Sequence, residues 1–321
     1  MFSKLQDARR RLATTAGWGL LIIGLVTVGS CAIGPGNVSG LTNHPLVMEK
    51  DISSTEGTAI GTPEVAATDG LLVMVYAQGA LAADTPPGPD RTHQGRIGIA
   101  TSSDGTVWTK GGTILSPSAS GGWDDWFLDT PALLRANDQW YLYYFGDTDN
   151  TVPGGAIGLA VSSDLESWER VGSSPVIEAG PAGTWDANWV ESPTLWHDDE
   201  SGTFNMWYTG VDENWIVRIG HATSADGIVW TKHPENPVLR ERYSDFRDHS
   251  IWDGSGAAVA SAFVHNGHRY LFYASQSVSA TLDGRNDPSI GLAISSDGVN
   301  FERYSNEPLF GAAETGEQPN G

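Results

Sequence analysis

The sequence contains a single cysteine, Cys31, in 321 residues. A disulfide framework within the chain is therefore excluded, and so is a cysteine-based metal or redox motif. Basic residues are also scarce, because 18 Lys and Arg stand against 39 Asp and Glu and give a formal net charge of -21. Nucleic-acid binding relies on Lys and Arg that neutralise phosphates. We therefore expect no nucleic-acid partner and a neutral or cationic ligand.

Helical periodicity is missing as well. Beyond the N-terminus no segment repeats its apolar residues every 3.6 positions, which argues against an α-helical domain. The chain also lacks a zinc-type Cys and His cluster, a phosphate-binding loop and a nucleophile elbow, so we expect no required cofactor and no metal site of that kind. What is abundant is Gly, Pro and Trp, at 39, 17 and 13 residues. This composition is typical of an all-β secreted domain.

One twelve-residue pattern occurs four times. Each copy reads Ile-Gly-x-Ala-x-Ser-x-Asp and ends on an aromatic residue, at residues 97–108, 157–168, 219–230 and 290–301. The alternation predicts a strand, Ser-x-Asp predicts a turn, and the aromatic residue begins a second strand. The repeated Asp residues should brace these turns, and the repeated Trp residues, Trp108, Trp168 and Trp230, should pack.

Two further strands are predicted upstream of each hairpin. Apolar runs occupy residues 71–76, 140–145, 204–208 and 269–273, and another short strand begins near Pro63, Pro131, Pro193 and Ala257. Four strands per unit, repeated radially, predict a β-propeller. The fold class is thus all-β, with four clear repeats of about 60 residues.

The N-terminus has the pattern of an export signal. Lys4 and Arg9 to Arg11 precede an apolar run over residues 20–28, which is short for a membrane-spanning helix. The run ends at Val28-Gly29-Ser30-Cys31, which resembles a bacterial lipobox. We expect residues 1–31 to be a lipoprotein signal peptide with lipidation at Cys31, 32–50 a tether, and 51–321 the propeller, held outside the cytoplasm on a bacterial membrane. The alternatives are an ordinary signal peptide or an uncleaved anchor.

Two carboxylates differ from the repeat. Asp129 and Glu191 each stand two residues before the proline of a first strand, at Pro131 and Pro193. The corresponding residues of the other two units are Gly61 and Ala258. A purely structural residue would recur in all four units, and first strands line the axis of a propeller. We therefore expect both carboxylates to face one axial cavity.

A pair of carboxylates across a cavity is what glycoside hydrolysis requires, because one protonates the leaving oxygen while another attacks or activates water. The alternative is that the pair caps loops or binds an axial cation such as calcium. Polar and indole side chains at the rim would suit sugar hydroxyls and sugar faces. The predicted substrate contacts are Trp126, Trp189, Trp215, Asp90, Asp212 and Asp253.

The repeat, the Trp-Asp segments before the first strands, and the Asp-x-Pro and Glu-x-Pro starts resemble the five-bladed propeller glycosidases of families 43, 32, 68, 117 and 130. The resemblance covers about residues 55 to 310. It implies a fifth blade, for which two alternatives are open. Either the fifth blade is degenerate and built from both termini, with residues 44–50 contributing a strand, or it is incomplete because the chain is truncated. It also implies that Glu191 is the general acid and that Asp129 orients substrate and tunes the pKa of the acid.

A third carboxylate, the base or nucleophile, should begin the first blade in an Asp-Pro pair, where this sequence has Thr62-Pro63. Either a loop residue replaces it, with Asp84, Asp90 and Asp253 as candidates, or the blade register is shifted, or hydrolysis is lost. The sequence thus favours a monomeric glycosidase acting on an oligo- or polysaccharide by hydrolysis or phosphorolysis. The alternative is a carbohydrate-binding lipoprotein. A sialidase-like propeller is disfavoured because the first strands offer no arginine cluster.

Overall fold

The structure is a computed structural model, and it describes residues 59–68, 70–79, 95–148, 154–242, 251–275 and 289–311. Within these residues, consecutive strands form four antiparallel sheets of four strands each. We call the sheets blades 1 to 4. Their strands are β1 (Ala59–Thr68), β2 (Leu71–Gly79), β3 (Arg96–Ser102) and β4 (Thr109–Leu115); β5 (Phe127–Ala136), β6 (Gln139–Asp147), β7 (Ala156–Ser162) and β8 (Glu169–Arg170); β9 (Trp189–Asp198), β10 (Thr203–Val211), β11 (Val217–Ser224) and β12 (Trp230–Lys232); and β13 (Ala258–His265), β14 (His268–Ser275), β15 (Ser289–Ser295) and β16 (Glu302–Arg303).

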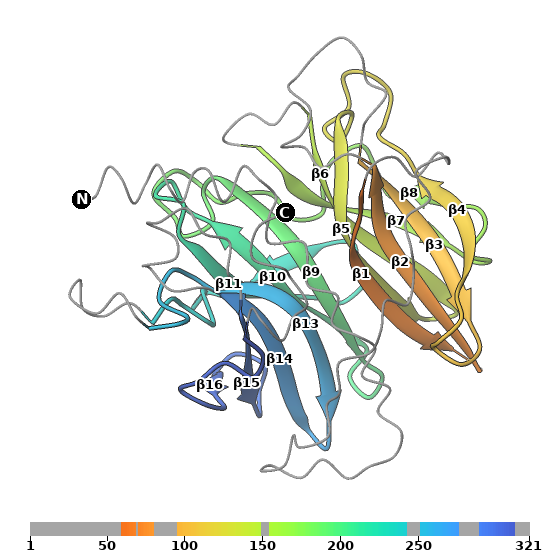
Figure 1. Cartoon of the computed structure of the whole chain (residues 1–321). Helices are drawn as coiled ribbons and strands as arrows, with labels where there is room; N and C mark the ends of the chain where they lie inside the picture. Colours follow the sequence, from red (N-terminus) through yellow and green to blue (C-terminus); the bar gives the residue numbers. More distant parts are fainter. Residues whose placement is uncertain are drawn as a thin grey trace.

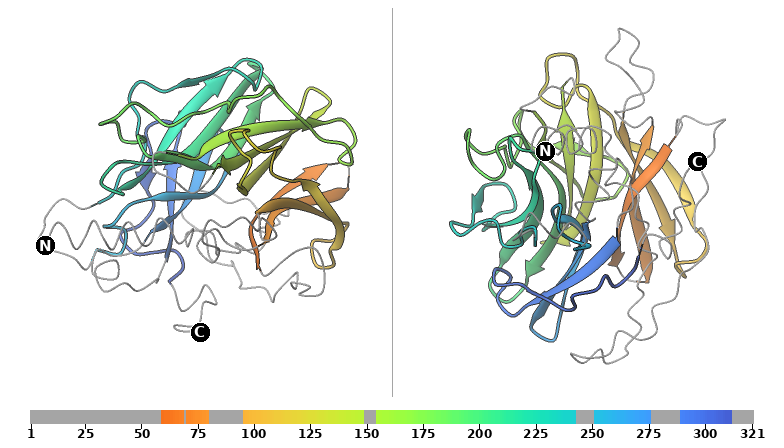
Figure 2. Two further views of the ribbon diagram at one scale, coloured as in Figure 1. Left: turned by 90° about the horizontal axis from the view of Figure 1, so that it is seen from above. Right: turned by 60° about the vertical axis from the view of Figure 1, so that its left-hand side comes forward.

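The blades are arranged around their first strands. β1 packs beside β5, β5 beside β9, and β9 beside β13. Figure 1 shows these four strands toward the middle of the molecule, with β4, β8 and β16 toward the outside, and Figure 2 shows the same sheets from two further sides. The all-β propeller predicted from the repeats is confirmed.

The described strands make four blades. Strands of blade 4 make no contact with strands of blade 1 comparable to those between the other neighbours, as far as the described ranges reach. The strand predicted at residues 44–50 lies outside the described residues, as do the signal peptide and tether. Among the residues that the structure places, no helix has both the length and the hydropathy needed to span a membrane.

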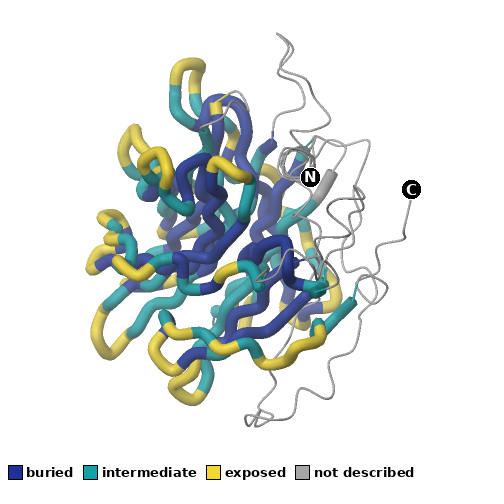
Figure 3. The backbone as a smooth tube through the Cα atoms, turned by 90° about the vertical axis from the view of Figure 1, so that its left-hand side faces the viewer, coloured by how far each residue is buried: buried dark blue, intermediate teal, exposed yellow. Residues whose placement is uncertain are grey.

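A tyrosine explains the glycine of each Ile-Gly pair. Tyr144 on β6 and Tyr208 on β10 are fully buried, and each ring lies across the neighbouring third strand. A Cβ atom at Gly158 would lie 2.6 Å from the ring of Tyr144, and one at Gly220 would lie 2.9 Å from that of Tyr208. Only glycine permits this approach. Figure 3 shows the result, with burial along the strands and exposure at the turns.

The Ser-x-Asp segments brace their turns as predicted. Asp104 Oδ1 accepts the backbone N–H groups of the second and third residues after it, at 2.8 and 2.9 Å, and Ser102 Oγ accepts that of residue 105 at 2.9 Å. The indole of Trp108 donates to the carbonyl of residue 105 at 3.2 Å. The carboxylate bonds recur around Asp164, Asp226 and Asp297. The indole bonds recur for Trp168 and Trp230.

These turns also join neighbouring blades. The hydroxyl of Tyr143 in blade 2 donates to the carbonyl of Gly227, in the turn of blade 3, at 2.6 Å. The indole of Trp207 in blade 3 donates in the same way to Gly298 of blade 4 at 2.8 Å. Both bonds are buried, so each replaces solvent at the blade interface with a specific contact.

Blades 1 and 2 use an apolar version of this contact. Val75 holds the β2 position that corresponds to Tyr143, and Leu165 holds the turn position that corresponds to Gly227. Val75 and Leu165 belong to one hydrophobic cluster. The donor and the glycine are therefore replaced together, which preserves the contact between the blades.

Candidate active site

The first strands of blades 1, 2 and 3 each carry a bulge near the start. The register of pairing shifts directly after Gly61 in β1, after Asp129 in β5 and after Glu191 in β9. A left-handed backbone follows, at a conformational cost for residues other than glycine. The three residues are Thr62 with φ 45°, Thr130 with φ 39° and Ser192 with φ 50°.

The bulges bring equivalent positions to the same place in each blade. Gly61, Asp129, Glu191 and Ala258 each pair with the residue that follows the buried tyrosine of the second strand. The alignment made from the sequence is therefore the alignment of the folded strands. Asp129 and Glu191 occupy matching points on two adjacent blades, and their charges interact.

Asp129 is buried, with 5% of its surface exposed. Its Oδ1 accepts a 2.7 Å hydrogen bond from the Thr62 hydroxyl of blade 1 and a 2.6 Å bond from the N–H of Thr130. Burial raises the pKa of the Asp129 carboxyl, and these two donors oppose that rise because they stabilise the charged form. Ser192 N–H donates to Thr130 Oγ1 at 3.1 Å, so the same bulges also connect blade 2 to blade 3.

Glu191 is more exposed than Asp129, although it is not on the open surface. The pKa of Glu191 is raised to about 7, chiefly by burial. The negative charge of Asp129 contributes to the same rise. The side chain of Trp189 acts in the opposite direction and lowers the pKa of Glu191. A carboxyl with this pKa is largely protonated at slightly acidic pH and readily exchanges a proton near neutrality.

An indole pair borders Glu191. Trp189, with 9% of its surface exposed, meets Trp215 edge to face, with ring centroids 5.1 Å apart and planes at 71°. The N–H of Trp189 is near enough to Glu191 to stabilise its carboxylate, yet its geometry falls short of a hydrogen bond. Among the described residues this buried donor has no hydrogen-bond partner. Trp189 and Trp215 are thus brought together as predicted contacts beside Glu191.

Other predicted contacts are engaged elsewhere. Asp212 is buried and accepts a 3.0 Å hydrogen bond from Arg218, together with two backbone N–H groups of its own loop. Trp126 is buried, with 8% of its surface exposed, and its role as a substrate contact stays a prediction. Asp90 and Asp84 lie outside the described residues, so their predicted roles stay predictions.

Asp253 belongs to a repeated ion pair. It is fully buried and accepts hydrogen bonds from Arg303 at 2.7 Å and from the hydroxyl of Tyr273 at 3.0 Å. Asp124 of blade 2 and Asp186 of blade 3 bind Arg170 and Lys232 in the same way, at 2.8 and 2.6 Å. We therefore assign Asp253 a structural role and leave it out of the proposed catalytic set.

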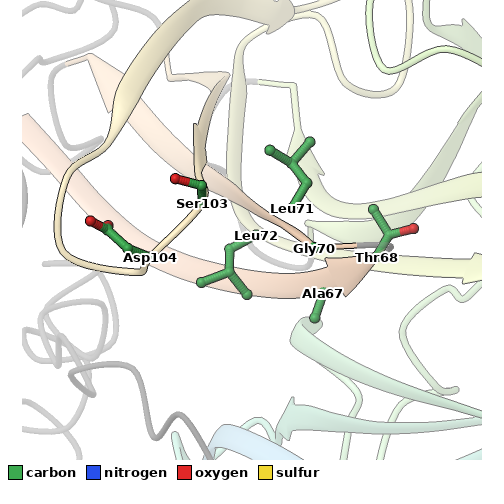
Figure 4. A pocket seen from close by; sticks show the side chains of 7 residues that line it. All are labelled: Ala67, Thr68, Gly70, Leu71, Leu72, Ser103 and Asp104. Carbon is green, nitrogen blue, oxygen red and sulfur yellow. The ribbon is translucent and has the colours of Figure 1, made fainter.

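Three hollows border the described blades. One of about 400 Å³ is lined by Gly154, Asn188, Glu213 and neighbouring residues, next in sequence to Trp189. Another, of about 590 Å³, lies beside the pair formed by Asp186 and Lys232. The third, of about 420 Å³, is shown in Figure 4 and is lined by residues of blade 1 that include Leu72 and Asp104. It lies at the turn end of the blade, and Asp104 is committed to its own turn.

The comparisons with known proteins agree with this geometry. The model of the glycosyl hydrolases family 32 N-terminal domain matches residues 123–281, which include Asp129 and Glu191. A family 117 glycoside hydrolase of the marine bacterium Zobellia galactanivorans superposes with a TM-score of 0.60 at 21% identity, over 81% of this chain and 73% of that one. The glycosyl hydrolases family 32 N-terminal model is thus recognised in the middle of this chain, and the fold is that of the five-bladed β-propeller glycoside hydrolases.

Two curated relatives match this chain over shorter stretches. An uncharacterized protein of Mycobacterium tuberculosis is 33% identical over 128 residues, which is 37% of this chain and 41% of the mycobacterial protein. An A type blood N-acetyl-alpha-D-galactosamine deacetylase of Flavonifractor plautii is 24% identical over 96 residues, or 29% of this chain and 12% of that protein. The chain thus spans well under half of either relative.

The chain departs from the expected set of three axial carboxylates. Position 61 in blade 1, which corresponds to Asp129 and Glu191, is a glycine. Glu64, three residues later on β1, is crowded enough that burial raises its pKa to about 8. Among the described residues, no three His, Cys, Asp or Glu side chains gather as a metal site.

Sequence reasoning missed two parts of the site. The first is the hydroxyl of Thr62, which donates to Asp129. The alignment of Thr62 with Thr130 and Ser192 was the signal that could have placed this hydroxyl beside the axial position. The ion pairs of Arg218 with Asp212 and Glu241 had no signal in the sequence, because Glu241 lies 23 residues beyond Arg218 and outside the repeat.

Proposed function

We propose that this protein cleaves a glycosidic bond in an oligo- or polysaccharide outside the cytoplasm, with Glu191 as the general acid. One observation carries the proposal. Glu191 combines partial exposure with a pKa raised to about 7, so that its proton is available for transfer at neutral pH. An acid matched to the working pH is the most effective proton donor to a leaving oxygen.

Asp129 supplies the second carboxylate. Fixed by the Thr62 hydroxyl and the Thr130 N–H, it holds one oxygen of its carboxylate in place and presents its charge to Glu191. That charge raises the pKa of the acid, and the fixed carboxylate would orient a sugar hydroxyl beside it. Protonation of the leaving oxygen by Glu191 breaks the bond as positive charge develops on the sugar, and water or phosphate completes the exchange.

The base or nucleophile is the open part of this mechanism. Asp84 and Asp90 stay candidates, whereas Asp253 is committed to Arg303 and Tyr273. Gly61 favours a second candidate function, in which the propeller binds a carbohydrate without cleaving it. In either case we propose a carbohydrate ligand, a monomer, and anchoring through a lipid on Cys31. No cofactor is proposed, and an axial calcium ion is left to experiment.

The experiment uses the secreted chain carrying Cys31→Ser, which blocks lipidation. It is screened on aryl glycosides and on plant, fungal and bacterial glycans, with Glu191→Gln in parallel and with release of both sugar and acetate recorded. Sugar release by the parent but not by Glu191→Gln supports the hydrolase. Equal glycan binding by both proteins without turnover supports the binding module. Acetate release that survives Glu191→Gln contradicts the proposed acid and points to deacetylation.

A further inference from the structure

Arg218 of β11 is the centre of an ion-pair network close to Glu191. Its Nη1 donates to Asp212 Oδ2 at 3.0 Å, while Nε and Nη2 donate to the two oxygens of Glu241 at 2.6 and 2.9 Å. Only 9% of Arg218 is exposed. A planar guanidinium that satisfies two carboxylates at once fixes both in space, because each bond restricts the same rigid group.

Asp212 also fixes the backbone of the loop that it begins. Its Oδ1 accepts the backbone N–H groups of Asn214 and Ile216 at 2.8 and 3.0 Å, and its carbonyl accepts the N–H of Trp215 at 2.9 Å. The same carbonyl accepts a 2.8 Å bond from the side chain of Asn188, the residue before Trp189. Asp212 therefore joins the loop at residues 212–216 to the start of β9.

This loop holds Trp215 in a strained backbone conformation. Trp215 has φ 63°, in the left-handed region that a bulky residue adopts only when its surroundings impose it. In that conformation its ring meets the ring of Trp189 edge to face. Trp189 stands two residues before Glu191 on the same strand, β9. A continuous set of contacts thus leads from Arg218 to the indole that precedes the proposed acid on β9.

Blades 2 and 4 lack the arginine on which this network depends. The third-strand position of Arg218 is taken by Ala156 in blade 2 and by Ser289 in blade 4. Blade 1 has Arg96 there. Arginine at this position is therefore shared by blades 1 and 3, whereas the turn Asp residues occur in all four blades. Of the two arginines, Arg218 is the one in the blade that carries Glu191.

We propose that Arg218 is a positioning residue, which through Asp212 and Trp215 sets the indole of Trp189 against Glu191 and the bound sugar. The inference rests on the proposed function for the identity of the acid. The position of Trp189, however, is measurable without any turnover. Trp189 then forms one wall of the subsite, with its N–H facing the carboxyl and the sugar oxygen that approaches it.

The test labels the full secreted chain with 5-fluorotryptophan and records fluorine NMR spectra. Trp189→Phe and Trp215→Phe assign the two resonances among those of the other tryptophans. Arg218→Met should shift or broaden both, and Glu191→Gln should shift that of Trp189. Arg218→Lys keeps the positive charge beside Asp212 but loses the pair of hydrogen bonds to Glu241, so it should have an intermediate effect.

The matched control is Arg170→Met. Arg170 lies on the outer strand β8 of blade 2 and forms a comparable ion pair with the buried Asp124. The control variant should leave the resonances of Trp189 and Trp215 in place. With a cleavable glycan, Arg218→Met should lower kcat/KM at least tenfold per folded molecule, and Arg170→Met should not. Unchanged Trp189 and Trp215 resonances in folded Arg218→Met would overturn the proposal. If the resonances shift in Arg218→Met but the wild type cleaves none of the glycans, the proposed hydrolysis is refuted and the positioning role of Arg218 stands.

Discussion

Thr62 of blade 1 donates a 2.7 Å hydrogen bond to Asp129 of blade 2. This bond reaches across a blade interface to the carboxylate next to the proposed acid. It comes from a strand whose own axial position, Gly61, has no side chain to offer. Blade 1 therefore contributes to the site through the bulge residue, and the following predictions begin with that residue.

Thr62→Val removes the donor and keeps the shape of the side chain. The pKa of Asp129, already raised by burial, should rise further, because a bond to its charged form is lost. A hydrogen bond to a charged group contributes about 1.5 to 3 kcal/mol, so we expect kcat/KM to fall roughly ten- to hundredfold. Thr62→Ser should retain most of the activity. Equal rates for the valine and serine variants would contradict a role for this bond.

Trp189→Phe removes the indole N–H that lowers the pKa of Glu191. The pKa of about 7 should then rise, since the opposing contributions of burial and of the Asp129 charge remain. A general acid works while protonated, so the alkaline limb of the pH profile of kcat/KM should move to higher pH. The profile is measured over pH 5 to 9 on the best substrate. A limb that stays fixed or moves to lower pH would count against the assignment.

Gly61→Asp supplies a carboxylate in blade 1, at the position where blades 2 and 3 carry Asp129 and Glu191. If hydrolysis is limited by a missing base or nucleophile, turnover should rise at least tenfold, which corresponds to about 1.4 kcal/mol of barrier. Gly61→Asn is the uncharged control of similar size. A parent that already turns over quickly and loses activity with Asp at this position would show that the base comes from elsewhere.

Glu64→Gln should stabilise the protein at alkaline pH. Burial raises the pKa of Glu64 to about 8 in the folded chain, above the ordinary value of 4.5 for this group. The favourable contribution of the protonated group is therefore complete below pH 4.5 and is lost as pH rises toward 8. We expect the variant to exceed the wild type by about 1 to 3 kcal/mol at pH 8 and to match it at pH 4.5. Urea unfolding at both pH values measures the difference, and no change with pH would contradict it.

Tyr143→Phe and Trp207→Phe test the bonds that join blades 2, 3 and 4. Each substitution leaves a buried glycine carbonyl, at Gly227 or Gly298, without its donor. The cost should be about 1 to 3 kcal/mol in the free energy of unfolding for the tyrosine, and more for the tryptophan because packing is also lost. Val75→Ala, at the apolar version of the contact, provides the comparison. A loss of activity without loss of stability would argue against this structural role.

The fold was predictable because its signals are local and occur four times. The Ser-x-Asp segments carry all the groups that brace a turn, and the alternation beside them defines strands. The equivalence of Asp129 and Glu191 followed from counting back from Pro131 and Pro193, and the strand pairing confirms it. Their roles in catalysis stay predictions, because neither the fold nor the family match assigns a reaction to a residue.

The role of Asp253 was not predicted, although the sequence contained the signal. Asp124, Asp186 and Asp253 each follow a tryptophan, and Arg170, Lys232 and Arg303 each stand two residues after the final aromatic of the repeat. A pairing that recurs in three blades is structural. By contrast, the Arg218 network joins residues with no common spacing, so only the folded chain brings them together.

The bulges after Gly61, Asp129 and Glu191 have a practical consequence for protein engineering. They present side chains of different chemistry from the same backbone shape, while the turns that hold each blade lie at the other end of the strands. Ala258 is buried in an apolar cluster with Trp189 and Val217, so a polar side chain there would disturb packing. Position 61, which carries only glycine, is therefore the place on this scaffold where a new functional side chain can be introduced away from the turns.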